Sequence, residues 1–402
     1  MTDKAVPADV LAEEASARLS SELLSALKRR PAQEARLAGV VRVLAPLSSR
    51  LRAQLLLALE TMVRRASIER PLYAALVRSL SEASHPSVSP PLARALGLDD
   101  AGGLATLSAA CFCRDPDLAE PLARAATSRH AHVAFAAELA RVSRGESNGG
   151  AVASLAPKIK ESHRISLCVE LLAPLLAGPP LPASVAPALA VLRDAERHLG
   201  RWLVLAEVAT RSGDKSPSEQ ARQRASQGPD SSRSAWALVL WALEPKSDCP
   251  DVRPTVELVA RLSDRPSADK DTTFLFRLAA AKAESARPML ESLVKSGALG
   301  DECRVRAMLH LCRDYGEARY GAELAALAGA KRREPLRALA AAALYDVGDT
   351  PPALAAADEL LQSRHISAIA WGALVRARHN TERAGAVVTE SHFRRLELGW
   401  VQ

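Results

Sequence analysis

The residues with the clearest capacity for chemistry are two pairs of metal-ligand types that lie close together in the sequence. Cys111 and Cys113 flank Phe112, and His130 and His132 follow them. Four nitrogen and sulfur ligands would suit a zinc ion. Residues two apart on a helix point in different directions, however, and a phenylalanine between the cysteines is typical of a packed helix face. We therefore expect most of these side chains to pack in the core or to lie on the surface. We expect no metal or other cofactor.

Sequence motifs for catalysis are missing from the chain. It contains no Gly-rich phosphate loop, no H-E-x-x-H and no G-x-S-x-G in a strand–turn–helix context. The remaining histidines have no consistent carboxylate partner by spacing. His310, between Leu309 and Leu311, is expected on a helix surface or satisfied between helices. The sequence predicts a protein that is not an enzyme.

Short basic clusters could instead contact phosphates. They are Lys28-Arg29-Arg30, Arg64-Arg65, Lys331-Arg332-Arg333, Arg376 with Arg378, and Arg394-Arg395. The net charge is only +7, from 53 basic and 46 acidic residues, whereas a nucleic-acid binder usually concentrates a larger excess on one face. Several clusters also sit at predicted helix ends, where cations complement the helix dipole. Nucleic-acid binding therefore remains an alternative function.

The elements that must position these residues are predicted to be helices throughout. Apolar residues make up 48% of the chain but aromatic residues only 3%, and Ala and Leu, which enter helices at little cost, dominate. Apolar residues recur at helical spacing over residues 8–29 and again after Ser49. The second of these stripes consists of Leu51, Leu55, Leu59 and Met62. Proline and glycine punctuate the helices.

The six cysteines form no C-x-x-C pair and most of them sit among apolar residues, which is typical of reduced, buried thiols. The chain begins without the apolar region of a signal peptide and has no apolar run of about 18 residues. These features predict a cytoplasmic protein that does not insert into a membrane.

Internal repetition indicates how the helices are arranged. The segment Val133–Leu139 recurs 32 residues later as Ile165–Leu171, with Glu-Leu at the same offset and a histidine upstream. The pattern Arg304-x-x-Ala307-x-x-x-Leu311 recurs after 33 residues from Arg337. A period of this length holds one pair of helices. The sequence therefore predicts an all-α fold, an α-solenoid of stacked antiparallel helix pairs with roughly twenty helices.

Three segments resemble known repeat families. The helix Leu336–Leu344 resembles the second helix of a HEAT repeat, and Asp115–Leu118 followed by Val133–Leu139 resembles a whole HEAT unit. Gly348-Asp349 with Ala353-Leu354 is similar to the turn and second helix of a tetratricopeptide repeat. The resemblance implies a right-handed superhelical stack with a concave face for partners.

The longest polar stretch divides the predicted array. Residues 212–232 hold Gly213, Pro217, Gly228 and Pro229 and are expected to form a polar loop or hinge, in which Ser218–Ala225 could form a short helix. We expect N-terminal repeats over residues 1–98, HEAT-like repeats over 99–211, and HEAT- or tetratricopeptide-like repeats with a C-terminal cap over 233–402.

These features predict a non-catalytic scaffold or adaptor that binds a protein partner along its concave face. An acidic segment is the expected ligand because the planar arginine fork pairs with carboxylates through two hydrogen bonds. The expected partner-binding residues lie on the second helices of the clearest repeats: Arg129, His132, Arg304, Arg337 and Arg364. A structural subunit of a larger assembly is the second alternative, and the oligomeric state stays open.

Overall fold

A computed structural model describes most of the chain between residues 41 and 379. The described residues are 41, 49–67, 71–82, 86–97, 103–176, 180–227, 230–244, 287–296, 300–329, 334–363, 368, 372, 375–376 and 379. Every regular element among them is a helix, so the predicted all-α class is confirmed for this part of the chain. Within the same residues, no helix combines the length and the apolar character that a membrane span requires.

The described helices fall into two runs along the chain. The first run contains α3 (Ser49–Arg64), α4 (Pro71–Glu82), α5 (Ser89–Leu96), α6 (Gly103–Ala110), α7 (Ala119–Ala125), α8 (Ala131–Ser143), α9 (Gly150–Leu155), α10 (Glu161–Ser166), α11 (Ala173–Leu175), α12 (Ala186–Asp194), α13 (Leu199–Arg211), α14 (Ser216–Gln227) and α15 (Asp230–Leu243). The second contains α18 (Arg287–Ser296), α19 (Gly300–Tyr315), α20 (Arg319–Gly329), α21 (Glu334–Asp346) and α22 (Thr350–Leu361). A π-helical stretch, η6 (Leu167–Leu172), joins α10 directly to α11.

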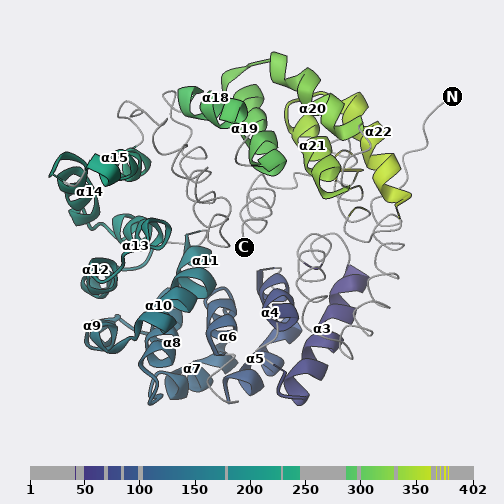
Figure 1. Ribbon diagram of the computed structural model, residues 1–402. Helices are drawn as coiled ribbons and strands as arrows, with labels where there is room; N and C mark the ends of the chain where they lie inside the picture. The colour runs from purple at the N-terminus through teal and green to yellow at the C-terminus, as the bar shows by residue number, and fades with distance from the viewer. Residues whose placement is uncertain are drawn as a thin grey trace.

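Helices that are neighbours in sequence pack against one another as pairs. Such pairs include α7 with α8, α12 with α13, α14 with α15, and α20 with α21. Successive pairs are linked in turn, since α4 packs on α6, α6 on α8 and η6, η6 on α13, and α19 on α21. The described helices follow the chain around a curve in Figure 1. The predicted packing of neighbouring helix pairs is therefore present.

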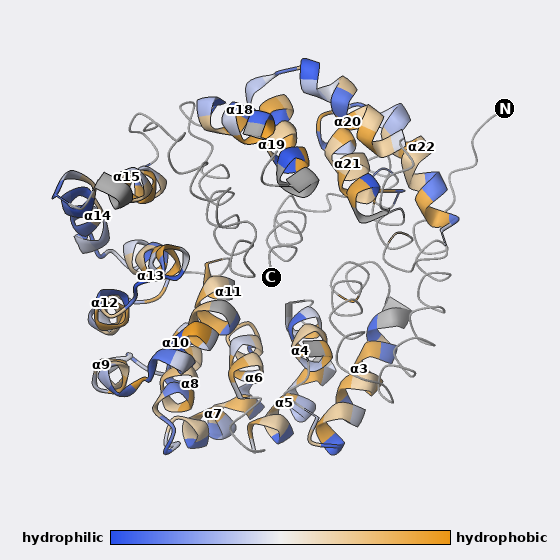
Figure 2. Ribbon diagram, in the orientation of Figure 1, coloured by the Kyte–Doolittle hydropathy of each residue, from blue (hydrophilic) through white to orange (hydrophobic). Residues whose placement is uncertain are grey.

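The apolar stripe predicted after Ser49 is one of the packed faces. In α3 the side chains of Leu55, Leu59 and Met62 are fully buried. Their spacing of three and four residues places them on one side of the helix, as the sequence pattern predicts. Other helices also carry apolar residues, which are drawn in orange on the ribbon in Figure 2.

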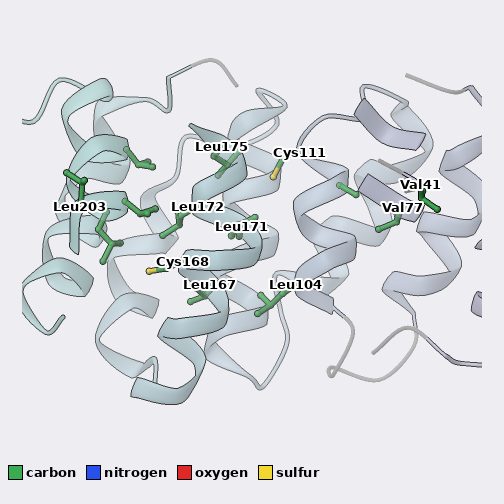
Figure 3. Packing of buried hydrophobic residues seen from close by; sticks show 14 of the residues in the cluster. Val41, Val77, Leu104, Cys111, Leu167, Cys168, Leu171, Leu172, Leu175 and Leu203 are labelled. Carbon is green, nitrogen blue, oxygen red and sulfur yellow. The ribbon is translucent and has the colours of Figure 1, made fainter. Parts of the chain in front are cut away.

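Small and medium-sized aliphatic residues build the core, together with buried thiols. Leucine side chains from η6 pack with Cys111 and Cys168 in the region that Figure 3 shows. Burial raises the pKa of the Cys111 thiol to about 12, and its Sγ donates to the Leu107 carbonyl at 3.3 Å. A thiol in this environment stays protonated and behaves as a small apolar residue. The thiols of Cys111, Cys113, Cys168 and Cys312 are free.

The polar stretch 212–232 contains a helix longer than the short one expected over Ser218–Ala225. Gly213 adopts a left-handed conformation (φ 90°) after α13, and Asp214 then accepts a hydrogen bond from the Ser216 amide at 2.9 Å. This contact caps the start of α14. Because Pro217 and Ala221 of α14 are buried, this helix packs on its neighbours instead of forming an open loop.

Candidate functional site

Basic and imidazole side chains gather where α8, α10 and α13 begin. We call this set the basic edge. It consists of Arg129, His130, His132, Lys160, His163, Arg164, Arg197, His198 and Arg201. Contacts between the imidazoles of α8 and α10 hold two of the helix starts together, and the charge of Arg201 in α13 interacts with Glu161 of α10. The packing of η6 on α13 explains this proximity.

Three histidines form the centre of the basic edge. The rings of His132 and His163 are stacked, with centroids 3.8 Å apart and planes 28° apart. His130 meets His132 edge to face, at 6.0 Å between ring centroids. Arg129 donates from Nε to Nε2 of His130 at 3.0 Å. Because arginine only donates, Nε2 of His130 is the acceptor in this contact.

The start of α13 is fixed by a buried carboxylate. Glu196 accepts hydrogen bonds from Nε and Nη2 of Arg201, each at 2.9 Å, and from the amides of Arg197 and His198 at 2.9 and 2.8 Å. Burial acts to raise the pKa of Glu196, but these bonds outweigh it and bring the pKa below its usual value. The guanidinium of Arg201 thus has its carboxylate partner within the protein, and this contact fixes the start of α13 in the basic edge.

The other members of the basic edge differ in exposure. Arg129, Lys160 and Arg197 are exposed, whereas His132, His163 and Arg164 are partly buried. The Nε atom of Arg164 is buried and makes no hydrogen bond. The arrangement combines exposed charges with oriented, partly buried donors, which suits recognition of carboxylate or phosphate oxygens.

The structure separates the predicted partner-binding residues into two groups. Arg129 and His132 both belong to the basic edge. Arg304 of α19 pairs with Glu323 of α20, and Arg337 of α21 pairs with Glu359 of α22. These two arginines already have carboxylate partners within the protein. Arg364 lies outside the described residues.

The residues considered for a zinc site are divided among different surroundings. The Sγ of Cys113 lies 3.4 Å from the hydroxyl of Ser89. Cys111 is in the core, and its thiol donates a hydrogen bond to the Leu107 carbonyl. His132 is engaged with His163. Across the segments that the structure describes, no group of three or more His, Cys, Asp or Glu side chains could hold a metal ion.

A buried histidine–aspartate pair in α19 was not predicted from the sequence. Nδ1 of His310 lies 2.9 Å from Oδ2 of Asp314, and Arg313 donates from Nε to Oδ1 of Asp314 at 3.0 Å. Both partners are largely buried. The signal was available, because the two residues are four apart and side chains at that spacing meet on a helix. The expectation that His310 has no carboxylate partner at helical spacing is therefore wrong, and the partner lies in the same helix, not in a neighbouring one.

Asp314→Asn tests whether this pair stabilises the fold. Burial acts to raise the pKa of Asp314, but the bonds from His310 and Arg313 lower it far below its usual value. A lowered carboxyl pKa contributes stability that is complete above the unfolded pKa of about 4 and is lost as the pH falls through the folded pKa. We expect a loss of about 1–3 kcal/mol at pH 7 that shrinks below pH of about 4.

Urea unfolding of both proteins across this pH range measures the effect. Glu219→Gln, at an exposed position of α14, serves as the control and should change stability by less than about 0.5 kcal/mol. A loss at Asp314 that is the same at every pH would show that the charge of this carboxylate does not stabilise the fold.

Comparison with protein-family models, with curated proteins and with solved structures finds no match to this chain. The basic edge must therefore be interpreted from its own residues.

Proposed function

We propose that the chain is an α-solenoid of HEAT- or tetratricopeptide-like helix pairs that acts as a binding scaffold. Its ligand is an acidic segment of a protein partner, held at the basic edge. The packing of helix pairs in chain order and the repeat period of 32 to 33 residues support the solenoid. The binding role rests on one observation, the gathering of exposed cations around the stacked histidines of α8 and α10.

The chemistry of the basic edge favours carboxylates. Arg129 and Arg197 present planar guanidinium groups, which pair with carboxylates through two hydrogen bonds. The nearby carboxylate of Glu196 already accepts hydrogen bonds from Arg201 and at the start of α13. The acidic side chains of the partner would therefore contact Arg129 and Arg197, whose charges Glu196 does not neutralise.

The charges elsewhere favour a protein partner over a nucleic acid. A duplex requires a long row of cations along its phosphates. In the second run of helices, the structure pairs many of the cations with acidic residues of the same protein. The pairs are Arg287–Glu317, Arg319–Glu291, Arg304–Glu323 and Arg337–Glu359, and Arg376, which lies beyond α22, pairs with Asp358. This part of the chain thus offers fewer uncompensated charges, and the basic edge is short enough to suit a peptide segment.

Charge reversal at the basic edge tests the proposal. We expect Arg129→Glu combined with Lys160→Glu to weaken binding of a fluorescein-labelled Asp/Glu-rich peptide at least tenfold in an anisotropy assay, because two attractive contacts become repulsive. The control is Arg65→Glu combined with Lys215→Glu, which changes the net charge equally at exposed positions outside the edge. The control should bind within about twofold of the original protein.

Two further outcomes would contradict the proposal. One is equal weakening by the edge and control variants, which would mean that only net charge matters. The other is salt-sensitive binding of random duplex DNA together with no binding of the acidic peptide, which would favour the nucleic-acid alternative. Arg304→Glu combined with Arg337→Glu should have a smaller effect than the edge variant, because Glu323 and Glu359 already occupy those arginines.

A further inference from the structure

An open cavity of about 230 Å³ lies beside the basic edge, between α5, α6, α7 and α8. Its apolar wall includes Leu96, Leu107, Ala125 and Val133, and its polar groups include Arg124 and Ser128. Ser128 directly precedes Arg129, and Val133 directly follows His132. The Oγ of Ser128, which lines the cavity, also accepts a hydrogen bond from the His130 amide at 3.2 Å, so the cavity and the basic edge meet at the segment that precedes α8.

We propose that this cavity receives one apolar side chain, the size of leucine or phenylalanine, from the same acidic segment that the basic edge holds. The inference rests on the proposed function and specifies its ligand: an acidic segment with an apolar anchor residue. The edge would supply charge recognition, and the cavity would fix the register of the segment along it.

The size of the cavity favours a single side chain as the occupant. Sites for drug-sized ligands and cofactors usually exceed about 300 Å³, whereas an aliphatic cavity of roughly 150 Å³ can hold benzene. A volume of about 230 Å³ falls between these values and is sufficient for one leucine or phenylalanine side chain.

The charges around the cavity favour an acidic neighbour for that side chain. Arg124 lines the cavity and its side chain is 73% exposed, and its contact with Glu120 is long, at 3.9 Å. Such an exposed pair contributes little and opens easily. Arg124 can therefore turn to a carboxylate of the bound segment, as Arg129 can from the adjoining edge. An apolar residue flanked by acidic residues complements both features.

A pair of peptides separates the apolar anchor from the acidic background. Both are labelled Glu-rich peptides, with leucine in one and alanine in the other at a single central position. We expect the leucine peptide to bind about tenfold more tightly, as burial of a leucine side chain in an apolar site implies. Equal affinity of the two peptides would overturn the cavity proposal and leave the proposed function standing. If neither peptide binds to the folded protein, both proposals fail.

Two substitutions in the cavity wall should change this preference in opposite directions. Ala125→Leu fills the cavity and should reduce the leucine-to-alanine ratio to about one, while the affinity for the alanine peptide stays the same. Val133→Ala enlarges the cavity and should make a phenylalanine peptide bind more tightly than the leucine peptide. Ala325→Leu, at a partly buried position of α20, is the matched control and should leave the ratio unchanged.

Circular dichroism melting shows which variants are folded before binding is measured. If Ala125→Leu is unfolded, the preference of Val133→Ala for phenylalanine decides the question alone. A leucine-to-alanine ratio that persists in folded Ala125→Leu, or a Val133→Ala protein that still prefers leucine, would show that the anchor binds elsewhere.

Discussion

Replacing Arg193 with leucine is expected to lower the free energy of unfolding by about 3–5 kcal/mol and to release α14 from α12. Arg193 is the most deeply buried cation among the described residues, with an exposed fraction of only 1%. Its guanidinium donates to Gln220 at 3.1 Å, to Asp214 at 3.2 Å and to Ser216 at 2.8 Å. These three partners lie at the start of α14 and in the turn that precedes it.

The size of the effect follows from what the substitution leaves behind. Without Arg193, the carboxylate of Asp214 keeps only its hydrogen bonds from Ser216 and loses its cation, and the amide oxygen of Gln220 loses its donor, so the loss exceeds what the hydrogen bonds contributed. The pKa of Asp214 also depends on this contact. Burial acts to raise that pKa, but the bonds from Ser216 and Arg193 bring it below its usual value. Asp214 thus stabilises the fold above pH of about 4, and the variant should lose part of that pH dependence.

Chemical denaturation at pH 7 measures the loss, and hydrogen exchange of the α14 amides shows where it acts. Arg222→Ala is the matched control in the same helix. Arg222 pairs with Glu244 at 2.8 Å, but its side chain is 56% exposed, so its removal should change stability by less than about 1 kcal/mol. A loss at Arg193 no larger than that at Arg222 would mean that the buried network does not hold α14.

Gly149→Ala is expected to lower the free energy of unfolding by about 2–4 kcal/mol, for two separate reasons. Gly149 precedes α9 with φ 77°, a left-handed conformation that disfavours any Cβ. A Cβ there would also lie 3.0 Å from Val185 and 3.2 Å from Val142. The turn is therefore both conformationally restricted and tightly packed.

Gly145→Ala separates the two contributions. Gly145 has nearly the same φ, 78°, but a Cβ at this position would meet nothing within 4 Å. We expect it to cost only about 1 kcal/mol, and the difference in the midpoints of urea unfolding gives the packing contribution at Gly149. Equal losses at both positions would show that Val142 and Val185 move aside freely.

Composition and periodicity were sufficient to predict the helices, because Ala- and Leu-rich stripes leave few other ways to bury apolar surface. The stripe of Leu55, Leu59 and Met62 in α3 is buried as its spacing predicts. The polar stretch after α13 was harder to interpret. Its serines and glycine indicate a loop, and the contact that supports α14 comes from Arg193, 21 residues before Asp214. A partner so distant in sequence leaves no local signal.

For the same reason, the sequence predicts only part of the candidate site. The repeat pattern predicts Arg129 and His132, but their neighbour His163 belongs to the next helix pair, and only packing brings the imidazoles of His132 and His163 together. Arg304 and Arg337 share a 33-residue pattern, and the sequence does not show that a glutamate of the following helix meets each of them. By contrast, the pairing of His310 with Asp314 could have been predicted from their spacing alone.

The π-helical stretch η6 has a consequence for how these helix pairs can change in length. A π-turn hydrogen-bonds each residue to the fifth one along, so it accommodates one residue more than an α-turn without ending the helix. An inserted residue can therefore be absorbed at Leu167–Leu172 while α10 and α11 remain parts of one continuous helix. Such an insertion would change the spacing between matching residues of neighbouring helix pairs while the helix kept its place in the fold.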